Sequence, residues 1–480
     1  MKTHRTALVW LRRDLRLTDN PALLHALAHA ERVVPLFVFA PDEEQRWAPG
    51  AASCWWLHHS LVALDRSLRT LGSQLVVQRG PSLQALLRAV SETGATLVCW
   101  NKLYEPAALK RDAEIAAALD RNDVTVEQSN GALLFQPGSI LNGQELPYRV
   151  FTPFWRTVEK ELSTLPPPRK APSELPAVPR KVSRIGIDEL ALLPRIAWDQ
   201  GLAAAWTPGE AGALKQLQQF GKHIANYPTG RDRPDHADTS RQSPHLHFGE
   251  IGPRQIVAML RHSDHGAAQS KGTDSYLRQL GWREFAHHLL FHFPATATAP
   301  LNPQFAKQKW RQSRVDLNAW QRGATGIPLV DAGMRELWST GWMHNRIRMI
   351  VASVLTKNLQ LHWLQGAQWF WDTLVDANLA NNTLGWQWVA GCGADAAPYY
   401  RIFNPVLQAE RFDPQRHYIR QWLPEIARLP DRWIHQPWAA PEAVLQTAGI
   451  HLGVTYPRPV VDLGESRKRA LQAYAQLRND

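Results

Sequence analysis

Uncharged amide side chains gather in two segments of the second half of the chain, where they lie among apolar and aromatic residues. In the first segment, helical spacing places Asn345, Arg348 and Met349 on one face. In the second, Asn378 and Asn382 precede two tryptophans. Amide groups donate and accept hydrogen bonds, so this combination suits the edge of a flat heterocycle. For either segment taken alone, the alternative is a polar loop whose amides are satisfied within the chain.

Hydroxyl and guanidinium groups form a third candidate group in the proline-broken stretch 227–241, which ends in Thr239 and Ser240 just before an expected helix. Hydroxyls and free backbone N–H groups at the start of a helix can hold phosphate oxygens, and an arginine can pair with them. The alternative is that these hydroxyls only cap the helix.

Histidines and cysteines do not predict a metal centre. The pairs at 245/247 and 287/288 lack a third placed ligand, so we interpret them as ordinary histidines and expect no metal. Cys54, Cys99 and Cys392 are far apart. They are too few for a four-thiolate iron–sulfur cluster, and a disulfide framework is not expected. We therefore expect a protein of the reducing cytoplasm.

Length and composition indicate a globular protein of two domains with a polyanionic partner. The chain has 480 residues, 44% of them hydrophobic, and no apolar run long enough to cross a bilayer. Its start turns charged after one short apolar stretch, which is not typical of a signal peptide. A net charge of +11 favours nucleic acid as a partner, although a generic basic protein fits equally well. The 21 tryptophans suit packing first, but so many leave room for stacking on bases or a cofactor.

The first 130 residues alternate strand and helix signals, which predicts an α/β, Rossmann-like domain with a parallel sheet. Strands are expected at 6–11, 33–40, 74–78, 95–100 and 124–127. No Gly-x-Gly-x-x-Gly follows the first strand, so a dinucleotide site of the usual kind is not supported.

The rest of the chain divides into a linker and a helical domain. Residues 131–200 are expected to link the domains, with a proline-rich core at 163–184. Residues 201–480 are expected to form an all-α domain, because helical periodicity replaces β-alternation there. The expected helices span 211–220, 253–260, 276–288, 330–339, 344–356 and 367–374.

Taken together, the segments resemble the photolyase/cryptochrome family, and most closely its bacterial cyclobutane pyrimidine dimer photolyases. The resemblance runs from Leu-Val-Trp-Leu-Arg-Arg-Asp-Leu-Arg-Leu at 8–17 to Tyr-Tyr-Arg-Ile-Phe-Asn-Pro at 399–405. Between these ends, four motifs occur in the family's order and spacing. They are residues 239–244, residues 281–285, the helix that contains Met343, and residues 376–388.

The resemblance implies that FAD is the cofactor and that the helical domain binds it. One set of residues matches those that line the FAD phosphates and sugar: Tyr227, Arg231, Thr239, Ser240 and Ser243. A second set matches residues around the isoalloxazine ring: Asn345, Arg348, Asp376, Asn378 and Asn382. Within it, Arg348 and Asp376 match an ion pair, and Asn382 matches the asparagine that faces flavin N5.

The resemblance also implies DNA containing pyrimidine dimers as the partner and light-driven repair as the activity. Trp282 and Trp388 match the aromatic residues that hold the flipped-out dimer, with Met349 beside them, and Arg346 and Arg401 match contacts to backbone phosphates. Stacking on such rings offsets part of the few kcal/mol that base flipping costs.

A chain of three tryptophans is implied for electron transfer to the photoexcited, oxidised flavin. Trp386, Trp363 and Trp310 match its members in the family. Structural packing is the alternative for each ring taken separately. No membrane partner is expected, and we expect the protein to act as a monomer.

Three positions bear on how far the resemblance extends. Gln279 stands where photolyases place a glutamate against the dimer, so a hydrogen-bond donor remains but no transferable proton does. Asn378 stands where a second aspartate is usual, and losing that negative charge should favour the anionic flavin and raise its reduction potential. Glu105 matches a residue that contacts the folate antenna of some relatives, but the Cys-Lys pair those relatives use is missing after Pro294. If the protein binds an antenna chromophore, we expect a reduced folate (methenyltetrahydrofolate). It would then be bound differently from the folate of those relatives.

Two functions remain open from the sequence. The first is a deoxyribodipyrimidine photo-lyase whose activity is reduced or directed to another lesion. The second is a cryptochrome-like blue-light photoreceptor with weak or no repair of cyclobutane dimers, which Gln279 favours.

Overall fold

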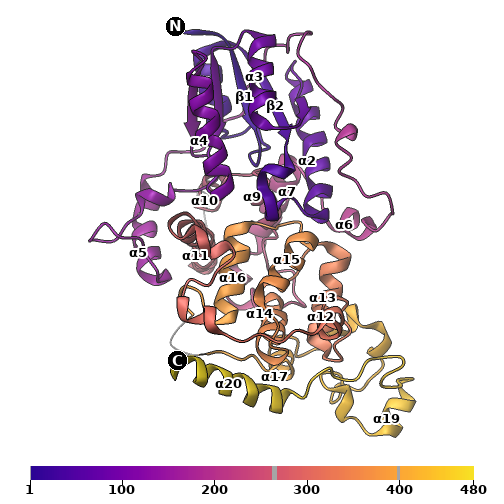
Figure 1. Cartoon of the computed structure of the whole chain (residues 1–480). Coiled ribbons are helices and arrows are strands. Elements are labelled where there is room, and N and C mark those ends of the chain that lie inside the picture. Colours follow the sequence, from indigo (N-terminus) through magenta and orange to yellow (C-terminus); the bar gives the residue numbers. More distant parts are fainter. Residues whose placement is uncertain (1, 262–266, 397–399, 480) are drawn as a thin grey trace. The chain divides into compact units, whose positions relative to one another are not determined.

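The computed structural model describes residues 2–261, 267–396 and 400–479, drawn in colour in Figure 1. Tyr399, the first residue of the motif at 399–405, lies outside them. The chain forms two compact units: Met1–Ala225, Ser240–Pro294 and Val375–Leu379 form the first, and Asn226–Thr239, Ala295–Leu374 and Ala380–Asp480 form the second. Residues 201–480 contribute to both units, so the domain limits taken from the sequence remain a proposal.

Five parallel strands form one sheet in the first unit, in the order β3-β2-β1-β4-β5. The strands are β1 (His4–Leu11), β2 (Ala30–Phe39), β3 (Val76–Arg79), β4 (Leu97–Asn101) and β5 (Thr125–Ser129). In the register, Leu8 of β1 pairs with Val34 of β2 and with Val98 of β4. The predicted α/β domain with a parallel sheet is therefore confirmed.

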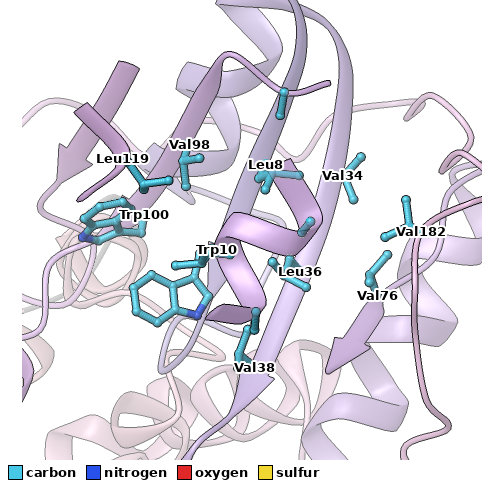
Figure 2. Packing of buried hydrophobic residues seen from close by; sticks show 14 of the residues in the cluster. Leu8, Trp10, Val34, Leu36, Val38, Val76, Val98, Trp100, Leu119 and Val182 are labelled. Atoms are coloured by element: carbon cyan, nitrogen blue, oxygen red, sulfur yellow. The ribbon is translucent and has the colours of Figure 1, made fainter. Parts of the chain in front are cut away.

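Helices cover both faces of this sheet. Alternate strand residues, among them Leu8, Trp10 and Leu36, form a buried cluster with residues of α3 (Ser82–Thr93) and α4 (Pro106–Asp120), and Figure 2 shows this packing. The helix α1 (Pro21–His29) also contacts the strands, but its buried residues are not in the cluster. Because successive strand residues point to opposite faces, α1 covers the other face.

Charged side chains fill the carboxyl edge of the sheet between β1 and β4. Arg12 pairs with Asp112 at 2.6 Å, and Arg13 pairs with Glu105 and, at 2.8 Å, with Glu44. Ligands of open α/β sheets usually bind at this edge, where the strand order reverses. Here the chain's own ion pairs occupy it.

The remaining described chain consists mainly of helices, as predicted for residues beyond 200. In the first unit these include α5 (Phe151–Glu161), α7 (Glu210–His223), α9 (Ser243–His247), α10 (Pro253–Arg261) and α11 (Ala267–His292). The second unit contains α13 (Pro328–Thr340), α14 (Asn345–Ser353), the π-helical η8 (Val354–Asn358), α15 (Trp363–Thr373), α17 (Pro405–Phe412) and α20 (Leu463–Asn479). It also contains α16 (Leu379–Ala390) from Ala380 onward.

Two features of these helices add to the sequence analysis. The helix α5 lies in the segment expected to be linker and packs against α11. The segment 376–388, for which a polar loop was the alternative, is mostly the helix α16. No helix within the described residues has the length and hydropathy needed to span a membrane.

Candidate functional site

In the first unit, α11 presents a partly exposed polar and aromatic face. Gln279 and Trp282 are both partly exposed and, three positions apart, share this face. The Phe151 ring of α5 stacks on the Trp282 ring with centroids 3.7 Å apart and planes 9° apart. The stack fixes the orientation of the Trp282 ring, which lies on the same helix face as the amide of Gln279.

Close packing of α5 against α11 depends on Gly281. A Cβ atom at this position would lie 2.1 Å from the Trp155 ring of α5, so only glycine permits the observed approach. The sequence analysis did not identify the aromatic residues of α5 as part of the site. Identifying them requires knowing that α5 packs against α11, which is far away in the sequence.

The residues predicted to surround the flavin in the first unit include two hydrogen-bonded side-chain pairs. The Ser243 hydroxyl donates to Oδ2 of Asp376 at 2.6 Å. Nδ2 of Asn378 lies 3.3 Å from Nε2 of His287, a histidine to which the sequence analysis assigned no functional role. Ser240 is partly exposed, and its hydroxyl accepts the backbone N–H of Gln242 at 3.3 Å.

In the second unit, α14 gathers its predicted site residues around one sulfur atom. Nδ2 of Asn345 lies 3.9 Å and a guanidinium nitrogen of Arg346 lies 4.0 Å from Sδ of Met349. Arg346 also pairs with Asp232 at 2.8 Å. Arg348, on the same helix, donates from Nε to the Met343 carbonyl at 2.8 Å.

The helix α16 of the second unit orients Asn382 through the backbone. Nδ2 of Asn382 donates to the Ala367 carbonyl at 3.0 Å, which assigns the direction of the amide. A second N–H and the carbonyl oxygen of the same amide remain for a ligand. Farther along, the Arg401 guanidinium lies 4.9 Å from the centre of the Trp388 ring, so a predicted phosphate contact and a predicted lesion residue lie together.

The residues of the second unit that are predicted to bind the FAD phosphates and sugar differ in solvent exposure. Tyr227 is buried in the short helix α8 (Tyr227–Gly230), and burial raises the pKa of its hydroxyl to about 12. The Arg231 guanidinium lies 5.8 Å from the Tyr227 ring and is partly exposed. Thr239 is also partly exposed.

The three predicted electron-transfer tryptophans all lie in the second unit and differ in burial. Trp386 and Trp363 are buried, and Trp310 is partly exposed. The His362 ring lies 5.1 Å from that of Trp310 and 5.8 Å from that of Trp363, a link that the sequence analysis missed. It also missed Trp320, a buried ring 6.1 Å from Trp386.

Glu105, the candidate antenna residue, takes part in the ion pairs of the sheet edge. Burial alone would raise the pKa of its carboxyl group, but Arg13 and His287 lower that pKa to about 2. Nearby, a cavity of about 520 Å³ is lined by residues that include Lys102, Tyr104 and Phe291. Its walls therefore offer one cation and two aromatic rings from the first unit.

The chemistry of these side chains suits a flavin. Among the described residues, no group of three or more His, Cys, Asp or Glu side chains has the geometry to hold a metal ion. The amides of Asn378 and Asn382 have defined directions, as a ring edge with alternating donors and acceptors requires. The partly exposed Arg231 supplies positive charge suited to phosphate.

Comparisons with known proteins agree with this chemistry. Residues 276–476 match the family model for the FAD binding domain of DNA photolyase, and residues 7–175 match the model for DNA photolyase. A deoxyribodipyrimidine photo-lyase of Agrobacterium fabrum is 44% identical over 98% of this chain and 98% of its own. Cryptochrome-2 of Arabidopsis thaliana is 40% identical over 100% of this chain and 80% of its own. The crystal structure of a bacterial class III photolyase from Agrobacterium tumefaciens matches with a TM-score of 0.95 and 43% identity, covering 100% of this chain and 99% of its own.

Proposed function

The chain belongs to the DNA photolyase and cryptochrome family and carries its FAD-binding domain, and from this premise we propose that it repairs pyrimidine dimers in DNA under blue light. The observation that carries the proposal is the face of α11. There Trp282, supported from behind by Phe151 at 3.7 Å, lies beside the hydrogen-bonding amide of Gln279. A flipped-out pair of adjacent pyrimidines is bound by this combination of an aromatic ring for stacking and a polar group for hydrogen bonding.

The chain's own residues would hold FAD through two groups of contacts. Tyr227, Arg231, Thr239, Ser240 and Ser243 would bind its phosphates and sugar, and Asn345, Arg348, Asp376, Asn378 and Asn382 would bind its ring system. When bound in its reduced form, FAD supplies the electron that light makes available for splitting the dimer. The Asn382 amide can donate to or accept from the ring, so it serves more than one protonation state.

Aromatic, apolar and basic side chains would bind the damaged DNA. Trp282, Met349 and Trp388 would contact the dimer, and Arg346 and Arg401 would neutralise phosphates on either side. Binding should therefore weaken as salt rises, because each neutralised phosphate releases counterions. We propose that the protein acts on DNA as a monomer.

Gln279 should reduce the repair of cyclobutane dimers or redirect the enzyme to another lesion. Its amide donates a hydrogen bond but transfers no proton, whereas a carboxylic acid does both. We expect Gln279→Glu to raise the quantum yield of repair on an oligonucleotide with one thymine dimer. Equal yields for the wild type and the variant would show that proton transfer from this position is unimportant.

The three tryptophans should carry electrons from the surface to the flavin pocket. Trp386 and Trp363 are buried and Trp310 is partly exposed, as short hops toward the surface require. We expect Trp386→Phe to abolish light-driven reduction of bound FAD, followed by its absorbance in the presence of a thiol. Trp320→Phe is the matched control, because it removes a buried indole that touches Trp386. An equal loss in both variants would point to packing instead of electron transfer.

A reduced folate is proposed as a second chromophore, and the cavity beside Tyr104 and Phe291 is the place we assign to it. Glu105 is turned into an ion pair with Arg13, so we expect other residues to hold the pteridine ring. The chromophores released from purified protein identify what is bound. Protein that contains FAD but takes up no added methenyltetrahydrofolate would contradict this assignment.

A blue-light photoreceptor is the second candidate, and Gln279 is the observation that favours it. One experiment separates the two functions: photoreduce the protein with a thiol, add an oligonucleotide with one cyclobutane thymine dimer or, in a parallel reaction, one with a (6-4) lesion, and follow loss of each lesion by chromatography. Light-dependent loss supports repair. Photoreduction without loss of either a cyclobutane or a (6-4) dimer would overturn repair and favour the photoreceptor.

A further inference from the structure

His287 and Asn378 form a buried side-chain pair. The family resemblance implies that Asn378 stands where an aspartate is usual beside the flavin. His287 lies near the end of α11, and Asn378 lies in the segment Val375–Leu379 of the same unit. Both side chains are buried, with exposed fractions of 5% and 7%. Nε2 of His287 and Nδ2 of Asn378 are 3.3 Å apart.

The backbone determines which ring nitrogen of His287 carries the proton. Nδ1 lies 2.9 Å from the Arg283 carbonyl oxygen, which can only accept a hydrogen bond. Nδ1 therefore carries the hydrogen, and in the neutral ring Nε2 is an acceptor. The amide nitrogen of Asn378 donates to it, so the carbonyl oxygen of that amide points away from His287.

Burial and charge keep this ring neutral. Burial, together with the charges of Arg283 and Arg13, lowers the pKa of His287 to about 4 against the opposing effect of Glu105. His247, from α9, also acts on Glu105 and is itself buried and held neutral. Glu284, itself buried, pairs with Arg283 at 3.5 Å.

We propose that His287 is a positioning residue for Asn378, and that the two form an uncharged hydrogen-bonded pair that fixes the direction of the Asn378 amide. An aspartate at position 378 would place a carboxylate oxygen against the lone pair of Nε2. That contact becomes favourable only when Nε2 gains a proton, which creates an ion pair. The negative charge expected from an aspartate would then be largely cancelled by the histidine.

The inference reaches the flavin only through the proposed function, which places Asn378 beside the ring. If that placement holds, Asn378→Asp alone changes the local charge little, and the reduction potential of bound FAD falls only slightly. The double variant Asn378→Asp with His287→Gln keeps the carboxylate and a hydrogen-bond donor but removes the cation. Its potential should fall clearly further than that of the single variant.

The first measurement tests the pair without reference to catalysis. Full-length protein with bound FAD and ¹⁵N-labelled histidine is titrated by NMR, and the His287 signal is identified by its loss in His287→Gln. In the wild type we expect a neutral ring with the proton on Nδ1 throughout the range above pH 6. In Asn378→Asp we expect the pKa of His287 to rise above its usual value of 6.5. His288→Gln, a change at the neighbouring buried histidine, should leave the His287 signal neutral.

Each outcome has a distinct meaning. A wild-type ring that titrates near its usual pKa, or carries its proton on Nε2, would overturn the inference. An unchanged pKa of His287 in Asn378→Asp would do the same. If the NMR results hold but the potentials of the single and double variants are equal, the pair is real and the placement of Asn378 beside the flavin fails. The two hypotheses can therefore fail separately.

Discussion

The carboxyl edge of the sheet and the α5–α11 contact lie in the same unit, yet their side chains do opposite things. At the sheet edge, Arg12 and Arg13 end in buried ion pairs with carboxylates of the same chain. At the helix contact, Phe151 supports Trp282 from behind and leaves it partly exposed. Charge pairing fills the crevice between β1 and β4, where open α/β sheets usually bind ligands. Aromatic stacking leaves a supported ring partly exposed on α11.

Removing Arg13 should have the largest effect, because it breaks the closed edge. Arg13→Ala leaves the buried carboxylate of Glu105 without its cation, and such a loss costs about 3–5 kcal/mol. The control is Arg69→Ala, which breaks an exposed pair with Asp65 worth about 0.3–0.5 kcal/mol. Urea unfolding followed by circular dichroism compares the two variants.

The result decides whether this edge is held by charge. Arg13→Ala with Glu105→Gln should recover part of the loss, since the uncompensated buried charge is gone. If Arg13→Ala is no more destabilising than Arg69→Ala, the ion pairs do not stabilise this part of the fold.

Replacing Gly281 should have an intermediate effect, because it breaks the open aromatic surface. In Gly281→Ala the new Cβ atom meets the Trp155 ring at 2.1 Å, and overpacking of this kind costs about 1–3 kcal/mol. Gly385→Ala is the matched control on α16, since nothing lies within 4 Å of its new Cβ atom. That control should stabilise the protein by about 0.5–1 kcal/mol, because alanine favours helix over glycine. Similar unfolding free energies for both variants would show that α5 and α11 can separate without cost.

The sequence predicted local order better than contacts between distant segments. All five strands were placed within a few residues, because most are short apolar runs bounded by turn residues and they alternate with helical segments. The Phe151–Trp282 stack and the His287–Asn378 pair were missed, and 91 positions separate the members of the second pair. Sequence periodicity predicts local secondary structure and does not predict which distant segments come into contact. Those contacts are seen only in the folded structure.

The amides of the candidate site indicated a flat heterocycle on chemical grounds, but the role of each residue was taken from the family resemblance. The roles of Asn382 and Trp386 follow from the match of the segment 376–388 to a family pattern, and they remain proposals. His362 shows the limit of that approach: it touches Trp310 and Trp363 but belongs to no motif that we used. His362 is the N-cap residue of α15, and its ring accepts a hydrogen bond from the Leu364 N–H. This cap holds the ring between the two tryptophans.

The smallest expected effect is on DNA binding, when the ring of Phe151 behind Trp282 is removed. This change tests whether the stack contributes to binding as well as to packing. Phe151→Leu keeps most of the buried volume but removes the ring behind Trp282, and an aromatic pair contributes about 0.5–1.5 kcal/mol beyond its area. We expect affinity for dimer-containing DNA to fall roughly 3- to 10-fold, measured by fluorescence anisotropy in the dark. Phe154→Leu is the control, since Phe154 is an equally buried ring of α5 that contacts Phe285 and His288. Equal affinities in the two variants would mean that Trp282 needs no support from Phe151, and that the open surface is held by α11 alone.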